Sequence, residues 1–191
     1  VLVYSFFTAE PRQERYFFHP LFQVLLLGVN WSFITGDLFN LFVSFEMMLT
    51  ASYVLLTLGG RLEQVRSGMT YIVISLLASV LFVAMLAFVY ASTGTVNMAD
   101  LAGKVGDLPP GLRSALAVLM LVVFGIKAAI FPLFFWLPDS YPTAPSPVTA
   151  IFAGLLTKVG VYAIIRTQTL LFPADTRPTT LLLVLAGATM L

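Results

Sequence analysis

Cysteine is absent from the 191-residue chain, histidine occurs once, and charged side chains make up only 10% of the residues. Without cysteine the chain can form no disulfide, no thiolate metal site and no cysteine nucleophile. The carboxylates and the histidine do not cluster at metal-ligand spacing, and no nucleophile–base pair or glycine-rich phosphate loop is present. We therefore expect no metal, no cofactor and no enzymatic site in this chain.

Basic runs are missing as well, and so is any basic stripe with interleaved aromatic residues. The formal net charge is +1, whereas a nucleic-acid-binding surface gathers positive charge on one face. Nucleic acid is therefore excluded as a partner.

Apolar residues dominate what remains, at 59% of the chain. An ordinary soluble domain has roughly a quarter of its residues charged, and a spanning helix needs roughly 20 apolar residues. Several segments meet that length, so we predict an all-α, polytopic bundle of transmembrane helices embedded in a lipid bilayer. The chain begins at Val1 without Met and stops inside the apolar run "LLLVLAGATML", and we expect an internal fragment of a longer protein.

The apolar runs and the breaks between them predict the order of the segments. Residues 1–19 form the end of a preceding helix and a charged loop, residues 20–172 one repeat, and residues 179–191 the start of a further helix. The predicted spans within the repeat are 20–36, 38–58, 69–91, 113–136 and 147–171. Asp37 is expected to cap the second of these, and Asn97 to cap a short helix that lies along the membrane surface.

Three charged residues fall inside the apolar spans. Glu46 is ninth of 21 residues in the apolar run 38–58, Lys127 thirteenth of 22 in the run 115–136, and Lys158 twelfth of 19 in the run 147–165, so each lies within about 3 Å of the centre of its run. Together they cost on the order of 8 to 10 kcal/mol to insert before any pairing. A buried ion pair that only joins helices is one interpretation, but such pairs rarely stabilise more than apolar packing. We favour proton translocation through Glu46, Lys127 and Lys158 near the midplane.

Two prolines follow Lys127 where its helix would otherwise continue. Because proline has no backbone N–H, Pro132 is expected to free the carbonyl of Ala128, and Pro138 that of Phe134. Broken helices at membrane depth line hydrated cavities and mark ion sites in transporters. The next span carries small residues at four-residue spacing before Lys158, and we expect Lys158 to point into the protein.

Three stretches resemble one family of membrane proteins. They are "FHPLFQVLLLGVNWSFITGDLFNLFVSFEMMLTASYVLLTLGG", "TGTVNMADLA" and "FGIKAAIFPLFFWLPDSYPTAPSPVTAIFAGLLTKVGVYAIIR". They resemble the D subunits of the multisubunit Mrp (Mnh) cation/proton antiporters and, more broadly, the antiporter-like membrane subunits of respiratory complex I and membrane-bound hydrogenases. The resemblance implies a fourteen-helix-type fold with two inverted five-helix repeats, of which residues 20–172 are the first. It places the family's essential glutamate at Glu46, the lysine of its broken helix at Lys127, and its next lysine at Lys158.

The resemblance also implies a function and a setting. The chain would belong to a monovalent cation (Na⁺)/proton antiporter in a prokaryotic cell membrane, assembled with the other Mrp subunits. Two alternatives stay open: a proton-pumping membrane subunit of an NADH-quinone oxidoreductase or hydrogenase, and a structural membrane scaffold that transports nothing.

Overall fold

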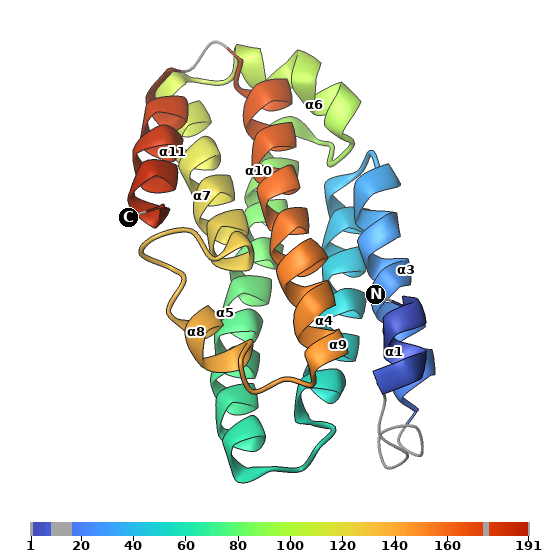
Figure 1. The fold of residues 1–191 in the computed structure, drawn as a ribbon. Helices are drawn as coiled ribbons and strands as arrows, with labels where there is room; N and C mark the ends of the chain where they lie inside the picture. The colour runs from blue at the N-terminus through green and yellow to red at the C-terminus, as the bar shows by residue number, and fades with distance from the viewer. Residues whose placement is uncertain (1, 9–16, 174–175, 191) are drawn as a thin grey trace.

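The computed structural model describes residues 2–8, 17–173 and 176–190 (Figure 1). Most of the charged loop expected before residue 20 lies outside these residues. The described part contains helices and no strand, with one isolated backbone bridge between Asp37 and Asn97. The elements are α1 (Leu2–Thr8), α3 (Phe18–Ile34), α4 (Leu38–Thr57), α5 (Leu62–Thr93), α6 (Met98–Lys104), the 3₁₀ turn η1 (Val105–Asp107), α7 (Pro110–Ala128), α8 (Trp136–Ser140), α9 (Ser146–Ile151), the π-helix η2 (Phe152–Leu156), α10 (Thr157–Leu171) and α11 (Thr176–Thr189).

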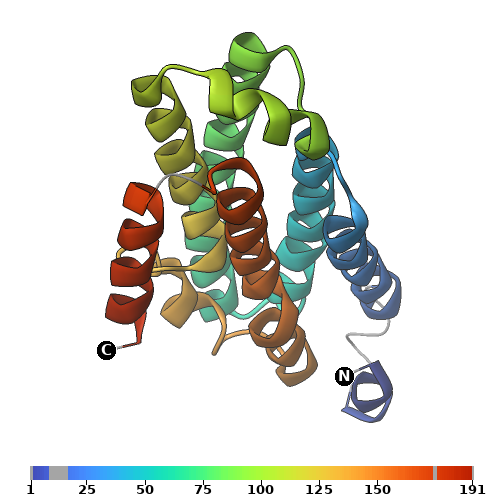
Figure 2. The same ribbon diagram turned by 90° about the horizontal axis from the view of Figure 1, so that it is seen from above.

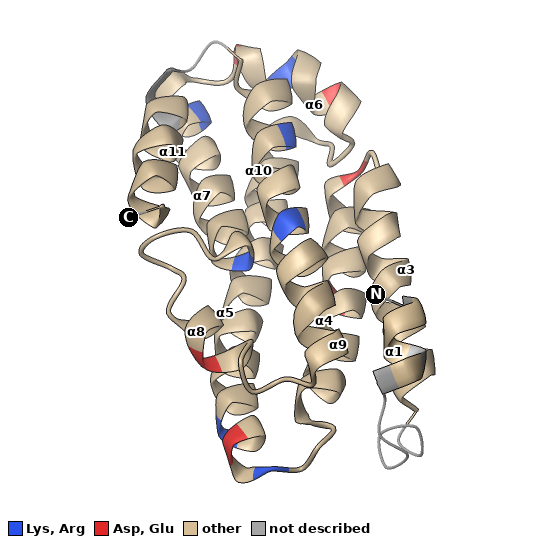
Figure 3. Cartoon of the chain, viewed as in Figure 1, with Lys and Arg blue, Asp and Glu red and all other residues tan. Residues whose placement is uncertain are grey.

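The long helices run side by side, α6 crosses one end of the bundle, and α8 and α9 lie toward the other (Figures 1 and 2). Within the described residues four helical stretches are long and apolar enough to cross a membrane, namely Leu38–Thr57, Leu62–Thr93, Pro110–Ala128 and Ser146–Leu171. Most charged residues colour the ends of the bundle, and few lie at middle depth (Figure 3). The predicted class, an all-α membrane bundle, is confirmed.

Helix α5 starts at Leu62, seven residues before the expected span at 69. Its N-terminus is capped locally, since the side chain of Gln64 accepts the backbone N–H of Arg61 at 3.3 Å. This contact supplies an acceptor for the N–H of Arg61, the residue just before the helix, as the glutamine of a capping box does. The polar stretch after Gly60 is therefore the first turns of α5 and not a connection.

Asp37 and Asn97 cap two helices that meet at the same end of the bundle. The Asp37 carboxylate accepts the N–H groups of Phe39 and Asn40 at 2.8 and 3.0 Å, and the Asn97 side chain caps α6 in the same way. Both predicted caps are confirmed. The segments before the two helices also exchange backbone bonds, because Leu38 N–H donates to Val96 O and Met98 N–H to Gly36 O, each at 2.9 Å.

Helix α6 lies with its apolar side against the bundle, where Met98, Leu101 and Val105 are buried. Its outer side carries an i,i+4 ion pair, Asp100 with Lys104, at 2.8 Å. The hydrogen bond from Lys104 lowers the pKa of Asp100. Because this pair is exposed, it contributes little to stability, and the buried apolar face is what attaches α6.

Gly160 lets α10 cross α7 at close range. A Cβ atom placed on Gly160 would lie 2.6 Å from Ala128 N and 2.8 Å from the carbonyl carbon of Lys127. These are backbone atoms, which cannot move aside without shifting a helix. The contact therefore fixes the end of α7 that carries Lys127.

We expect Gly160→Ala to lower the free energy of unfolding by about 1–3 kcal/mol, as overpacking does in well-packed cores. The measurement is the thermal unfolding midpoint of the purified, assembled protein. Gly111→Ala in α7 is the matched control, because its Cβ would meet nothing within 4 Å. Equal midpoints for the two variants would contradict the close crossing.

Candidate functional site

Lys127 lies in the last turn of α7. The helix ends because Ala129 adopts a left-handed conformation, with φ 56° and ψ 48°. The N–H groups of Ala129 and Ile130 turn back to the carbonyls of Ile126 and Gly125 at 3.2 and 3.0 Å, as in a helix C-cap. Counting along residues 115–136 as one continuous run puts Lys127 near the centre of that run, but the structure puts it at a helix C-terminus, where the dipole favours a cation.

The helix is interrupted between α7 and α8, where residues 129–135 are not helical. Pro132 lies inside this non-helical segment. Pro138 instead lies in the first turn of α8, where no N–H is required, and the carbonyl of Phe134 accepts the N–H of Leu137 at 2.9 Å. Pro138 therefore frees no acceptor, contrary to our expectation, and the break is at Ala129 and Pro132.

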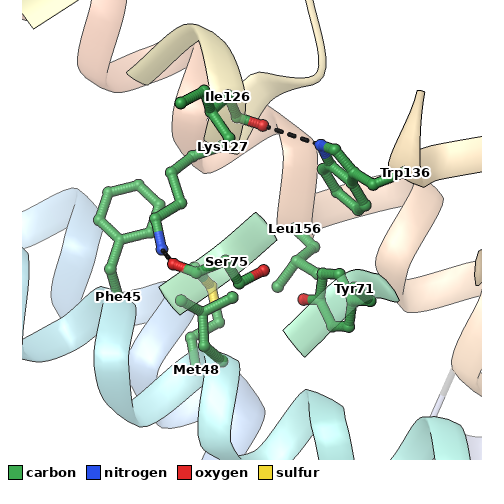
Figure 4. Close-up of a pocket in the computed structure, with 9 residues that line it drawn as sticks. Phe45, Met48, Tyr71, Ser75, Ile126, Lys127, Trp136 and Leu156 are labelled. Atoms are coloured by element: carbon green, nitrogen blue, oxygen red, sulfur yellow. Dashed lines mark hydrogen bonds between the residues drawn. The ribbon is translucent and has the colours of Figure 1, made fainter. Parts of the chain in front are cut away.

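The Lys127 side chain points from the end of α7 toward α5 and α4 (Figure 4). Only 4% of it is exposed. Its Nζ donates to the carbonyl of Ser75 at 3.3 Å and to the hydroxyl of Ser79 at 3.2 Å, and it lies 5.8 Å from the centre of the Phe45 ring. The ammonium therefore has polar partners although it is buried.

Ser79 joins Lys127 to Glu46. The Lys127 Nζ and the Glu46 Oε1 atoms are 4.0 Å apart, too far for a direct hydrogen bond. The Ser79 hydroxyl donates to the same Glu46 oxygen and accepts from Lys127. Because the Glu46 side chain is 34% exposed, the three groups form a hydrogen-bonded path between a buried cation and a partly exposed carboxylate.

Ser79 is the last of four buried hydroxyl residues at four-residue spacing on α5, the others being Ser67, Tyr71 and Ser75. Each serine taken alone can bond its own helix and does not stand out in the sequence. The common four-residue spacing of the four hydroxyl residues is the signal that could have identified them. Ser67 Oγ lies 2.8 Å from Thr143 Oγ1, and Tyr71 Oη lies 2.9 Å from Ser52 Oγ. Buried hydroxyls therefore occur in successive turns of α5, and the last two of these residues, Ser75 and Ser79, bond Lys127.

Beyond Ser79 the same buried face of α5 is apolar. Phe82 lies there with its ring edge-to-face with Phe42 and Phe124, at centroid distances of 5.4 and 5.1 Å, and Phe45 adds a fourth ring at 6.0 Å. Met85, Leu86 and Val89 continue this apolar face. The polar environment of Lys127 therefore extends along α5 in one direction only within the described chain.

Lys158 lies elsewhere. It follows the π-helix η2 and is exposed in the described chain, with its Nζ bonded to Ala153 O at 2.5 Å and near Thr157 Oγ1 at 3.4 Å. Ala150 and Gly154 lie exposed on the same side. The prediction that Lys158 points into the protein is wrong for this part of the chain, because no described helix covers that face; Gly160 makes the close backbone contact instead.

No cluster of three or more metal-ligating side chains occurs among the residues that the structure describes. The structure thus brings two of the three predicted residues together, Glu46 and Lys127, and leaves Lys158 outside that contact. These features define a polytopic membrane bundle with an ionisable pair beside a broken helix.

Residues 35–191 match the family model described as "NADH:quinone oxidoreductase/Mrp antiporter, TM", and the chain belongs to this family. It is 53% identical to the D subunit of the Na(+)/H(+) antiporter of Alkalihalophilus pseudofirmus, over 99% of this chain and 39% of that relative. The chain therefore spans about two fifths of that protein's length.

Two solved structures share the fold. One is the Mrp complex from Dietzia sp. DQ12-45-1b, with a TM-score of 0.83 and 39% identity, covering 90% of this chain and 33% of the other. The second is the membrane-bound sulfane sulfur reductase, an archaeal respiratory membrane complex, with a TM-score of 0.83 and 35% identity, covering 88% and 35%. The fold therefore occurs both in an antiporter complex and in a respiratory one.

We expect Ser79→Ala to lower the free energy of unfolding by about 1–2 kcal/mol, because it leaves a buried ammonium and a carboxylate each short of one partner. Thermal unfolding of the assembled protein measures this. Ser92→Ala is the matched control, since Ser92 lies on the same helix and its hydroxyl bonds the carbonyl of Val89, one turn earlier. A loss no larger than that of the control would mean that Ser79 does not join the two charges.

Proposed function

We propose that the chain is part of a membrane subunit of a multisubunit monovalent cation (Na⁺)/proton antiporter in a prokaryotic cell membrane. In this proposal it assembles with the other Mrp subunits, and protons move through Glu46, Lys127 and Lys158. The observation that supports it most directly is the path from Lys127 through the Ser79 hydroxyl to Glu46, at a depth where ionisable groups are functional by default.

The separation of the two charges suggests how protonation is controlled. At 4.0 Å the carboxylate favours the charged ammonium, whereas burial disfavours it. Moving Glu46 closer to Lys127 would therefore load a proton onto the lysine, and moving it away would release one. Because the close contact at Gly160 holds the end of α7, the group that moves in this proposal is the partly exposed Glu46 side chain.

Lys158 is proposed as the group that exchanges protons with Lys127. Its exposure in this chain suits a residue that faces another part of the full-length protein. Its ammonium bonds a carbonyl within a π-helix, and π-helical segments recur at functional sites. The proton would pass from Lys158 to Lys127 across the interior of the bundle.

A second candidate function is proton pumping in a redox-driven complex, favoured by the likeness to the archaeal respiratory complex. The same lysines would serve there, with electron transfer in other subunits supplying the driving force. A purely structural scaffold is a third candidate, and it would tolerate neutral replacements at all three charges.

Lys127→Ala is expected to abolish cation-dependent proton transport without loss of assembly, because the protonatable group of the path is removed. The assay is collapse of a preformed pH gradient by NaCl or KCl in everted vesicles that hold the full-length protein and its partner subunits. Lys104→Ala, which removes an exposed lysine of α6, is the control and should transport normally.

The outcomes separate the candidates. Transport by wild type and by the control, but not by Lys127→Ala, supports the antiporter. A gradient that responds only to an electron donor moves the protein to the redox class. Equal transport by all three proteins contradicts a role for Lys127.

Lys158→Gln is expected to reduce transport to background without loss of assembly, because glutamine keeps a polar side chain of similar length and cannot carry the proton. Transport and assembly are measured on the same preparation. Normal transport by this variant would remove Lys158 from the proposed path.

A further inference from the structure

Trp136 crosses the helix break and bonds the backbone beside Lys127. Its indole Nε1–H donates to the carbonyl of Ile126 at 3.1 Å (Figure 4). Ile126 is in the last turn of α7, and its carbonyl also accepts the N–H of Ala129 at 3.2 Å, so the indole is a second donor to this carbonyl. A side chain ten residues further along the chain thus supplies a donor to the residue that precedes Lys127.

The indole ring is itself held by α5. It stacks on Tyr71 with centroids 5.1 Å apart and an interplanar angle of 29°, and Tyr141 meets it edge-on at 6.0 Å. Only 3% of Trp136 is exposed. Tyr71 is anchored in turn, through its hydroxyl, to Ser52 of α4 at 2.9 Å, so the ring has little freedom.

Lys127 is therefore fixed at two points relative to the same helix. Its ammonium bonds Ser75 and Ser79 of α5, and its backbone is tied through the Ile126 carbonyl and Trp136 to Tyr71, one turn before Ser75 on α5. Movement of Trp136 would change where the ammonium lies relative to Glu46.

The indole also forms one wall of a small cavity beside the ammonium, lined as well by Lys127, Tyr71 and Ser75 (Figure 4). The cavity has a volume of about 10 Å³, at the lower limit of what a single water needs. Trp136 thus both ties the helix end and limits the space for water next to Lys127.

We propose that Trp136 is a positioning residue for Lys127, acting through its N–H bond to the carbonyl of Ile126. It carries no proton itself. Its N–H holds the end of α7 at the place where the ammonium reaches Ser79 and Glu46.

Two replacements separate the N–H from the bulk of the ring. Trp136→Phe keeps an aromatic ring for stacking on Tyr71 and loses the donor. Trp136→His keeps a ring N–H at the corresponding position of the five-membered ring and loses the second ring. Both are made in the full-length protein, assembled with its partner subunits.

Two readouts are measured. The first is the rate of cation-dependent collapse of the pH gradient. The second is the rate at which a membrane-permeant maleimide labels a cysteine introduced as Ala128→Cys, in an otherwise cysteine-free background; Ala128 is buried at the end of α7. The transport readout rests on the proposed function, whereas labelling reports the position of the helix end directly.

We expect Trp136→Phe to slow transport and to speed labelling, each about fivefold, as the loss of one hydrogen bond predicts. Trp136→His should restore both rates to within about twofold of wild type, because it retains the donor. Trp31→Phe in α3 is the control for replacing a tryptophan away from the break, and it should alter neither rate.

The inference is overturned if Trp136→Phe matches wild type in both readouts. It is also overturned if Trp136→Phe and Trp136→His change both rates equally, since the volume of the ring would then be what matters. If Trp136→Phe does not assemble, the His variant decides: near-normal transport supports positioning, and failure to assemble overturns it. If wild type itself does not transport, the proposed function fails and the labelling rates alone decide the role of Trp136.

Discussion

A buried ammonium must be hydrogen-bonded, and in this chain that requirement is met where three helices converge. α7 stops within one residue of Lys127, and the lysine side chain bonds Ser75 and Ser79 of α5. Gly160 permits α10 to press against the same turn. The termination of α7, the close crossing by α10 and the hydroxyls of α5 are thus parts of one solution to burying a charge.

The break after Lys127 is bonded on both sides, although it has no regular structure. Trp136 bonds the carbonyl of Ile126 on one side, and the N–H of Phe131 donates to Thr189 of α11 at 2.8 Å on the other. Polar backbone groups in a membrane must find protein partners, and these two side chains provide them. One N–H in the break and one carbonyl beside it therefore have a side-chain partner within the protein.

Much of the fold could be predicted from the sequence because it depends on local patterns. Apolar run lengths predicted the helices, and Asp37 and Asn97 were recognisable caps because they precede helices by one residue. The end of α7 was not predictable in this way, because alanine favours a helix. Ala129 ends the helix in a left-handed conformation, and the N–H groups of Ala129 and Ile130 then bond carbonyls of the last turn. The π-helix before Lys158 has no sequence pattern that distinguishes it from the α-helix around it.

The charged residues of the candidate site could be predicted from the sequence, but the serine that joins two of them could not. Glu46 and Lys127 stood out because charge is costly in an apolar run. Ser79 did not stand out, because a serine in a helix can bond its own backbone, as Ser79 does with the carbonyl of Ser75 at 2.9 Å. Its bonds to Glu46 and Lys127 depend on the packing of other helices, which the sequence does not show. Lys158 was expected to point into the protein because Ala150 and Gly154 precede it at four-residue spacing. These small residues lie on a face of the bundle that no described helix covers.

Along α5, the buried residues before Ser79 include hydroxyls and those after it are apolar, which limits the directions in which a proton could move. Buried hydroxyls occur along α5 from Ser67 to Ser79, and four phenylalanine rings fill the bundle beyond Ser79. A proton arriving along the hydroxyls would find no polar continuation straight ahead within the described chain. In the proposed function, a proton at Lys127 would therefore leave sideways, toward the partly exposed Glu46 carboxylate.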